Sequence, residues 1–298
     1  MKNNSEIKII FDTDPDLGYE KNTRLYSFFH WFFVQVLNNL PISTRSFIKK
    51  SHYSAQRVIE KATTHEAIEI LYKHGVRSNS KTLFQKFFFK IWFATNNPKA
   101  VRNRLRLVTR ELKKAIQSTL SEKDNVEILS IAAGSARAIL DSIAEETFKN
   151  KKVSVTFLDK NPLANDYSKE LSVEYNYPAN YNLRWVVDNA KNFPNHFKNN
   201  VRPDVVEIVG LLDYFDDEAV LAIFSLIYKE LPDNGYFITS NIVDNTERKF
   251  VTKVVGWPMI YRKPEDFFKL ATRAGFSPDK LGFFYEPFKI HFLMVAKK

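Results

Sequence analysis

The sequence contains no cysteine, and this absence excludes several kinds of site at once. None of the 298 residues can form a disulfide bond, a zinc–thiolate site, an iron–sulfur cluster or a thiol nucleophile. Only six histidines are present, and the spaced metal signatures HExxH and the EF-hand loop do not occur. We therefore expect no metal site, and a chain without cysteine fits a reducing cytosol.

Long uninterrupted hydrophobic runs are also lacking. A membrane span needs roughly 18 apolar residues, whereas the most apolar stretch, residues 25–40, is interrupted by one serine, one histidine, one glutamine and two asparagines. Residues 1–16 contain four acidic side chains and lack the basic, apolar and small segments of a secretory signal. We therefore expect a cytoplasmic protein with no transmembrane segment.

Acidic residues are scarce in the first part of the chain. Residues 1–124 hold 22 Lys and Arg against 11 Asp and Glu, a net charge of +11, whereas residues 125–298 hold 22 against 23. The window 41–114 has a net charge of +13 and ends in a run of six basic residues: Arg102, Arg104, Arg106, Arg110, Lys113 and Lys114. Such a block can bind RNA, an anionic membrane surface or an acidic substrate, or it can be a solvated helix face.

Hydrophobic residues make up 44% and charged residues 26% of the chain, which excludes a disordered tail. The composition changes near residue 125, so we predict a basic, aromatic-rich helical extension at 1–124 and a second domain at 125–298. Helices are expected over 25–40 and 83–93, and a third is expected to start after Asn97, with Pro98 in its first turn, and to run through residues 100–120. The apolar stripe of residues 25–40 repeats at helical spacing: Leu25, Phe28, Phe29, Phe32, Phe33, Val36, Leu37 and Leu40. Such stripes usually pack in a core and otherwise form a lid or a membrane-facing surface.

The second part alternates short β-rich runs with helical stretches, a pattern typical of a parallel sheet with crossover helices. Strands are predicted at 126–131, 153–158, 183–187, 204–209 and 236–241, and helices at 137–149, 162–175 and 216–231, with Asp216 and Asp217 suited to capping the last. After a helix at 264–274 come two runs with only a short connection, which we expect to pair antiparallel. The fold class is therefore α/β, with a mostly parallel, Rossmann-like sheet, a C-terminal antiparallel hairpin and an N-terminal helical extension.

Ligands of open α/β sheets bind at the carboxyl ends of the strands, so the residues that follow each strand are the candidate site. The first strand is followed by AAGSAR (132–137), the second by DKN (159–161), the third by DNA (188–190) and the fourth by GLLD (210–213). These four segments are expected to lie at one edge of the sheet.

The series ILSIAAGSARAIL, VTFLDKNP, WVVDNA and DVVEIVGLLDYF, in this order and each at a predicted strand end, resembles the motif series of class I S-adenosylmethionine-dependent methyltransferases. The resemblance is specifically to a bacterial subgroup classed as "putative methyltransferases", and it covers roughly residues 127–298. It implies S-adenosylmethionine as the cofactor and the class I methyltransferase sheet as the fold.

The resemblance assigns cofactor contacts to the first two strand ends. Gly134, between Ala133 and Ser135, would let the backbone approach the methionine part of the cofactor. Asp159, followed by Lys160, stands where the family has an acid that accepts hydrogen bonds from both ribose hydroxyls. The alternative for Asp159 is a cap of the following helix.

The third strand end would hold the adenine ring. Asp188 resembles the acid that receives the adenine amino group, with the backbone of Asn189 or Ala190 beside the ring; the alternative for Asp188 is a turn acid. The glycine-rich turn departs from the family, because Ser130, Ala132 and Ala136 stand where an acid and two glycines are usual. The same departure argues against a nicotinamide dinucleotide, whose site needs the GxGxxG glycines.

The acceptor would face the fourth strand end. Gly210 begins this segment, and Asp213 is the candidate base or orienting group. Tyr214 and Tyr261 are further candidate catalytic residues, and Asn241 and Arg262 are weaker ones. His291 lies within the last strand, and we expect it to be a packed core histidine. Methyl transfer from a sulfonium depends largely on alignment, so no conspicuous catalytic group is required.

The N-terminal helices would then form a lid or an acceptor-recognition element that excludes water. One of the arginines at 102, 104 and 106 is expected to pair with the cofactor carboxylate or with an anionic acceptor. The leading hypothesis is a methyltransferase for a small-molecule or lipid-like acceptor. Open alternatives are an RNA or protein methyltransferase, an enzyme that transfers or cyclises the aminocarboxypropyl arm and releases methylthioadenosine, and a binding module without chemistry.

Overall fold

The computed structural model describes residues 7–73, 82–83, 86, 93–197 and 201–298. Its centre is one eight-stranded sheet with the order β1-β7-β8-β6-β5-β2-β3-β4. The strands are β1 (Ile9–Phe11), β2 (Asn125–Ile131), β3 (Lys152–Asp159), β4 (Tyr181–Val187), β5 (Val205–Ile208), β6 (Tyr236–Ile242), β7 (Leu281–Tyr285) and β8 (His291–Lys297). All neighbours pair in parallel except β8, which is antiparallel to both β6 and β7. The expected parallel sheet with a C-terminal antiparallel hairpin is confirmed.

The order of the strands reverses between β2 and β5, which are hydrogen-bonded neighbours. At such a switch point, the connections that follow the two neighbouring strands run to opposite faces of the sheet. They leave a crevice above the carboxyl ends of the two strands. The register places Ser130 of β2 opposite Glu207 of β5, directly below this crevice. The sheet therefore positions the four strand-end segments around one place.

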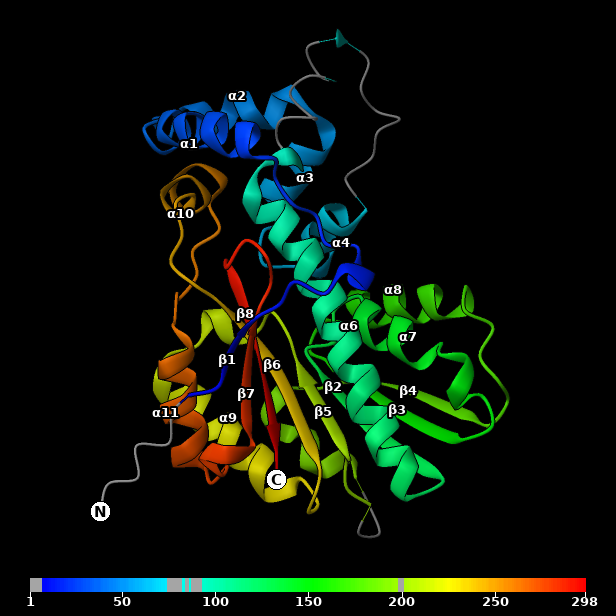
Figure 1. The fold of residues 1–298 in the computed structure, drawn as a ribbon. Helices are drawn as coiled ribbons and strands as arrows, with labels where there is room; N and C mark the ends of the chain where they lie inside the picture. Colours follow the sequence, from blue (N-terminus) through cyan, green and yellow to red (C-terminus); the bar gives the residue numbers. More distant parts are fainter. Residues whose placement is uncertain (1–6, 74–81, 84–85, 87–92, 198–200) are drawn as a thin grey trace, which may run out of the picture.

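Helices cover both faces of the sheet (Figure 1). One face carries α6 (Asn96–Glu122), α7 (Arg137–Ile143) and α8 (Pro162–Val173), and the other carries α9 (Asp217–Glu230) and α11 (Pro264–Ala274). The alternation of side chains along β2 explains the two layers: Val126 and Ile128 pack toward α6 and α7, and Leu129 and Ile131 toward α9 and α11. Asp216 caps α9 by accepting a hydrogen bond from the backbone N–H of Ala219, as expected from the sequence.

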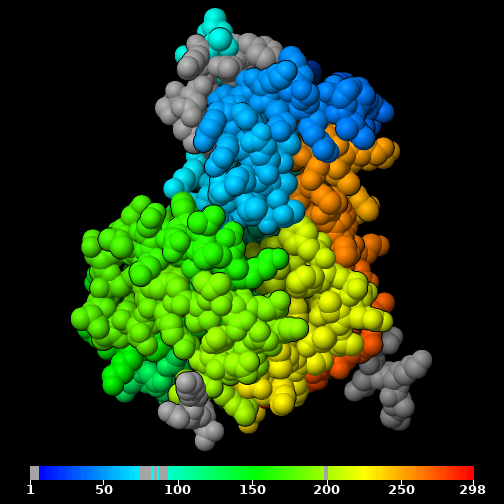
Figure 2. Space-filling view, turned by 180° about the vertical axis from the view of Figure 1, so that it is seen from behind, coloured from blue at the N-terminus to red at the C-terminus, as the bar shows by residue number. Residues whose placement is uncertain are grey.

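The N-terminal helices form a third layer above the carboxyl ends of the strands (Figures 1 and 2). They are α1 (Arg24–Asn38), α2 (Thr44–Ser51), α3 (Tyr53–Glu60) and α4 (His65–Tyr72), and they pack with α10 (Arg248–Phe250) and the π-helical turn η6 (Val251–Val255). Short 3-10 turns complete the structure: η1 (Pro15–Leu17), η3 (Glu146–Phe148), η4 (Ala190–His196), η5 (Leu212–Tyr214) and η7 (Pro278–Lys280).

Two N-terminal elements also belong to the sheet layers. The three residues of β1, which the sequence pattern did not predict as a strand, pair in parallel with β7 at the sheet edge. The long helix α6 packs its C-terminal half on the sheet through Leu112, Ile116 and Leu120, while its N-terminal half contacts α4. A boundary at residue 124 therefore falls between α6 and β2, two elements that are packed on each other.

The predicted helix at residues 83–93 lies almost wholly outside the described residues. The predicted helix at 25–40 is present as α1, but the expectation that its aromatic stripe packs in a core is wrong: the exposed fractions of Phe28, Phe29 and Phe32 are 60%, 60% and 51%. In the described part of the chain, no helix combines the length and apolar character of a membrane span.

Candidate active site

A cavity of about 810 Å³ lies between the strand ends and the N-terminal helices. Its volume is within the roughly 300–1,000 Å³ of small-molecule sites. Segments from all four predicted strand ends line it, together with α4, the start of α6 and the region of η6. All but one of the predicted catalytic and cofactor-binding residues line it: Ala133, Gly134, Ser135, Asp159, Lys160, Asp188, Asn189, Gly210, Asp213 and Tyr214.

The turn after β2 keeps a left-handed backbone although it has only one glycine. Gly134 has φ of +56°, and Ala132 and Ala136 have φ of +53° and +55°. These are the two alanines that stand where glycine is usual in the family that the sequence resembles. An alanine held at positive φ costs of order 1 kcal/mol or more. The turn therefore has the tight shape of a glycine-rich loop in spite of its composition. The backbone at its two alanines is strained as a result.

Asp159 ends β3 and fixes this turn. One carboxylate oxygen accepts a hydrogen bond from the backbone N–H of Gly134 (2.9 Å), and the other accepts one from the N–H of Asn161 (2.8 Å). Its exposed fraction is 9%, and it lines the cavity. A carboxylate has about four lone-pair positions, so each oxygen keeps one acceptor position. The cap of α8 is Asn161 rather than Asp159, because the Asn161 side chain accepts from the N–H of Leu163.

Asp188 follows β4 and lines the cavity, but its carboxylate already has protein partners. It accepts hydrogen bonds from the Asn189 N–H and the Asn192 side chain, and it lies 2.8 Å from Nε2 of His196. The bonds from Asn192 and His196 hold the pKa of Asp188 below its usual range. Lys160 is exposed at the rim of the cavity.

Glu207 is a functional candidate that the sequence analysis missed. It lies on β5, is buried, lines the cavity and accepts a 2.6 Å hydrogen bond from the Ser130 hydroxyl. Ser130 occupies the position at which the family has an acid, and the neighbouring strand supplies a carboxylate in its place. The acid inside the apolar run VVEIV (205–209) was the available signal, since a glutamate is rarely fully buried unless it is paired. Burial raises the pKa of Glu207 to about 7.

This raised pKa predicts a pH-dependent stability that Glu207→Gln removes. Because the folded-state pKa lies above the unfolded value, the carboxyl group destabilises the fold as the pH rises from about 4.5 through 7. Unfolding by urea at a series of pH values measures this effect. Across that window the free energy of unfolding of Glu207→Gln should rise relative to that of wild type, by about 2–3 kcal/mol above pH 8. Equal pH profiles for both proteins would show that the carboxyl group is not desolvated in the folded state.

The three predicted arginines divide into structural ones and one that reaches the site. Arg102 binds Glu20 (2.5 and 2.9 Å) and the carbonyls of Leu71 and Phe93, and Arg106 lies near Glu20. Arg104 instead lines the cavity, with an exposed fraction of only 4%. Its Nε has no hydrogen-bond acceptor among the described residues. Arg104 is therefore the arginine of this run that can receive an anionic group.

The segment after β5, which the sequence analysis predicted to face the acceptor, lines another part of the cavity. Gly210 has φ of +84°, and a Cβ there would lie 3.8 Å from the Arg104 guanidinium. Asp213 is buried, one oxygen accepts from the Ile242 N–H (2.9 Å), and burial raises its pKa. The Tyr214 hydroxyl accepts a 2.6 Å hydrogen bond from the Trp257 indole, and burial raises the pKa of Tyr214 to about 12. Tyr214 is thus a neutral wall residue.

Three other candidates do not line the cavity. Tyr261 lies against the Arg248 guanidinium, whose carbon is 4.3 Å from the ring centre. Asn241 donates to the carbonyls of Ile242 and Ile260, and Arg262 binds Asp217 and the carbonyls of Leu212 and Phe215. These side chains hold the loops behind the site.

Two histidines border the cavity. His291 is buried as expected, but it also lines the cavity, and neither ring nitrogen has a hydrogen-bond partner among the described residues. Its burial, with Arg104 nearby, lowers the pKa of His291 well below its usual value, so the ring is neutral at pH 7. His65, at the start of α4, lies over the turn after β2. A Cβ atom added at Gly134 would be 3.6 Å from the Cβ atom of His65.

Helix α4 is bound to the turn through Glu69. The Glu69 carboxylate accepts two hydrogen bonds from the Arg137 guanidinium (3.0 and 2.8 Å) and one from the Tyr167 hydroxyl (2.8 Å). Burial alone raises the pKa of Glu69, and the bonds from Arg137 outweigh it, so the pKa is lowered. The N-terminal layer is therefore fixed to the first turn of α7, next to Asp159.

Comparison with protein families gives one match over most of the chain. Residues 63–297 match the model of the family described as "Putative methyltransferase". This range contains α4, α6 and the whole sheet except β1. No curated protein matches the chain.

Solved structures with the same fold include three at low sequence identity. A possible exported protein from Bordetella parapertussis is 17% identical with a TM-score of 0.63, covering 80% of each chain. A "putative O-methyltransferase" from Nostoc punctiforme is 14% identical with a TM-score of 0.52, covering 82% of this chain and 71% of that one. Magnesium protoporphyrin IX methyltransferase from Synechocystis, solved with bound S-adenosylhomocysteine, is 13% identical with a TM-score of 0.51, covering 69% of this chain and 88% of that one. These likenesses concern the fold.

Proposed function

The chain belongs to the family described as "Putative methyltransferase", and we propose that it transfers a methyl group from S-adenosylmethionine to a small-molecule or lipid-like acceptor bound in the same cavity. The observation that carries the proposal is the continuity of the cavity. It extends from Gly134 and Asp159 at the cofactor turn to an apolar wall built by the N-terminal helices and η6.

The residues on the cofactor side fit S-adenosylmethionine. The left-handed turn at Gly134 leaves room for a close backbone approach, and Asp159 keeps an acceptor position on each oxygen for the two ribose hydroxyls. Arg104 is a partner of matching charge for the cofactor carboxylate or for an anionic group of the acceptor. Asp188 and Asn189 border the adenine end, with the Asp188 carboxylate shared between the ring amino group and His196.

The side of the cavity that we assign to the acceptor has an apolar wall. Its wall is made of residues from α3, α4 and the region of η6: Val58, Ile68, Leu71, Phe250, Val251, Val255, Trp257 and Met259. An apolar wall favours an acceptor with a hydrocarbon or aromatic body. Within the N-terminal extension 1–124, we therefore assign α1 to α4 the role of a lid and acceptor-recognition element, whereas β1 and the C-terminal half of α6 pack with the cofactor-binding domain at 125–298.

S-adenosylmethionine supplies an activated methyl group as a sulfonium, so alignment of the acceptor is the main task of the protein. Asp213 is the candidate to hold the proton of an acceptor hydroxyl, since its buried carboxylate lines the cavity and burial raises its pKa, which makes it a stronger base than a solvent-exposed carboxylate. In this proposal the N-terminal layer, whose helices line the cavity, limits the access of water to the reacting atoms.

The ion pairs of the basic window make RNA a poorer candidate acceptor. Much of its positive charge is matched inside the chain: Arg57 binds Glu66, Arg102 binds Glu20, Arg110 binds Asp12 and Asp14, and Lys113 binds Glu145. Transfer of the aminocarboxypropyl arm stays an alternative, because the turn near the methionine part has an unusual composition.

Product analysis tests the proposal. The protein is incubated with S-adenosylmethionine labelled in the methyl group and with a total lipid extract, and the aqueous and organic phases are analysed separately. We expect S-adenosylhomocysteine in the aqueous phase and label in the organic phase. Methylthioadenosine as the main product would contradict methyl transfer and support aminocarboxypropyl chemistry. In a parallel incubation with added RNA, label in the RNA but not in the lipid extract would contradict the lipid-like acceptor.

A further inference from the structure

One face of α1 exposes a continuous set of large apolar side chains, here called the aromatic patch. Their exposed fractions range from 51% to 69%: Leu25, Phe28, Phe29, Trp31, Phe32 and Val36. The rings touch one another, with centroid distances of 5.1 Å between Phe28 and Phe32 and 4.8 Å between Trp31 and Phe32. Exposed apolar clusters of this kind mark a surface that binds another apolar surface.

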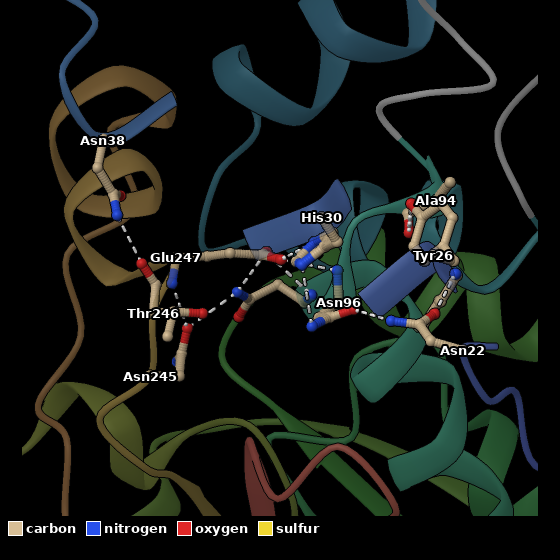
Figure 3. A network of polar contacts seen from close by, with 11 residues as sticks. Asn22, Tyr26, His30, Asn38, Ala94, Asn96, Asn245, Thr246 and Glu247 are labelled. Atoms are coloured by element: carbon tan, nitrogen blue, oxygen red, sulfur yellow. Dashed lines mark hydrogen bonds and ion pairs between the residues drawn. The ribbon is translucent and has the colours of Figure 1, made fainter. Parts of the chain in front are cut away.

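Hydrogen bonds fix the rotation of α1 so that this face points outward (Figure 3). On the inner face, Nε2 of His30 lies 2.9 Å from Glu247, the Tyr26 hydroxyl donates to the carbonyl of Ala94, and Asn38 bonds both the Thr246 carbonyl and the Phe250 N–H. Tyr26, His30 and Asn38 thus face the protein, and the residues of the aromatic patch face away from it. A rotation of α1 that buried the patch would break these bonds and expose the buried His30.

The charge around the patch has one sign. Residues 21–59 contain six Lys and Arg and no Asp or Glu. Lys21 and Arg24 are exposed at the start of α1, and Lys50 is exposed on α2, which also exposes Phe47. Ile42 is exposed in the turn between the two helices. Within residues 21–59, exposed aromatic and aliphatic side chains thus occur together with cations and without anions. This combination matches the boundary between the head groups and acyl chains of an anionic bilayer.

We propose that α1 and α2 dock the protein on an anionic membrane surface, with the aromatic patch at the boundary between head groups and acyl chains. Phe28, Phe32 and Trp31 supply the apolar contact, and Lys21, Arg24 and Lys50 supply the attraction to anionic lipid. The inference stands apart from the proposed reaction, because it rests on α1 and α2 alone and is tested without cofactor or turnover.

Co-sedimentation of the full chain with vesicles tests the proposal. Vesicles of phosphatidylcholine mixed with phosphatidylglycerol should bind the protein, vesicles of phosphatidylcholine alone should bind it less, and added salt should release it. Phe28→Ser/Phe32→Ser should weaken binding to the mixed vesicles by about tenfold or more. Arg24→Glu/Lys50→Glu should weaken it by at least about fivefold. The emission of Trp31 should shift to shorter wavelength on binding, and Trp31→Phe should lose this shift.

The matched control is Leu163→Ser/Val173→Ser, which removes two exposed apolar side chains (62% and 74%) of α8. It should bind vesicles as wild type does. Equal vesicle binding by wild type and Phe28→Ser/Phe32→Ser, with both proteins folded by circular dichroism, would overturn the proposal. The proposal would also be overturned if wild type were a dimer that does not bind vesicles and Phe28→Ser/Phe32→Ser were a monomer. The patch would then be the interface with a second copy of the chain.

Discussion

Asp159→Ala is expected to weaken the binding of S-adenosylmethionine and S-adenosylhomocysteine by about 100-fold or more. Each hydrogen bond to a charged group contributes about 1.5–3 kcal/mol, and the proposal assigns Asp159 two such bonds to the ribose hydroxyls. The substitution also releases the N–H groups of Gly134 and Asn161, which hold the turn in its left-handed shape. Equilibrium dialysis with labelled S-adenosylmethionine measures the effect.

Two further variants separate ligand contact from local collapse. Asp159→Asn keeps one acceptor oxygen and the shape of the side chain, so it should lose about tenfold. Asp166→Ala removes an exposed carboxylate of α8 that does not line the cavity, and it should bind as wild type does. If Asp159→Ala binds within threefold of wild type, the ribose lies elsewhere and the assignment of the strand ends is wrong.

Glu247→Ala is expected to lower the free energy of unfolding by about 3–5 kcal/mol, because it removes one half of a buried charged network. Glu247 has an exposed fraction of 1% and joins three segments: the His30 ring of α1, the N–H groups of Asn96 and Asn97 at the start of α6, and its own loop. Burial alone raises the pKa of Glu247, but the bonds from His30 and Asn97 outweigh it, so the pKa lies below its usual range.

Urea unfolding at pH 7 measures this loss of stability. The depressed pKa means that the stabilisation by Glu247 is present above the unfolded pKa near 4.5 and is lost as the pH falls below it. Glu60→Ala is the matched control, since Glu60 lies in the same helical layer but pairs with Lys49 at the surface, and it should cost less than about 1 kcal/mol. A Glu247→Ala protein as stable as the control would mean that α1 is not held by this network.

The sequence predicted the sheet, and the edge at which the strand-end segments meet around one cavity, because both follow from short-range patterns. Each strand is an apolar run that ends in a polar or glycine residue, and parallel strands bring such ends to one edge. Asp159 and Gly134 were therefore found together with Asp188 and Gly210. The hairpin was found because only a short connection separates its two runs.

The features that the sequence analysis left open or missed depend on contacts between distant segments. Nothing in the spacing of the arginine run separates Arg104 from Arg102, because one faces the cavity and the other faces Glu20, which is 82 residues away along the chain. The pairing of Ser130 with Glu207 requires the register of β2 against β5. The aromatic stripe of α1 was expected to be buried, since its spacing gives the face of the helix but not the direction in which that face points.

The measurement that tests the central claim most directly is a calorimetric titration of the wild-type protein with S-adenosylmethionine and with S-adenosylhomocysteine. The cavity geometry predicts that both compounds bind with saturation at equal molar amounts of ligand and protein. The absence of saturable binding for either compound would contradict the assignment of the cavity as a cofactor site, and with it the proposed methyl transfer.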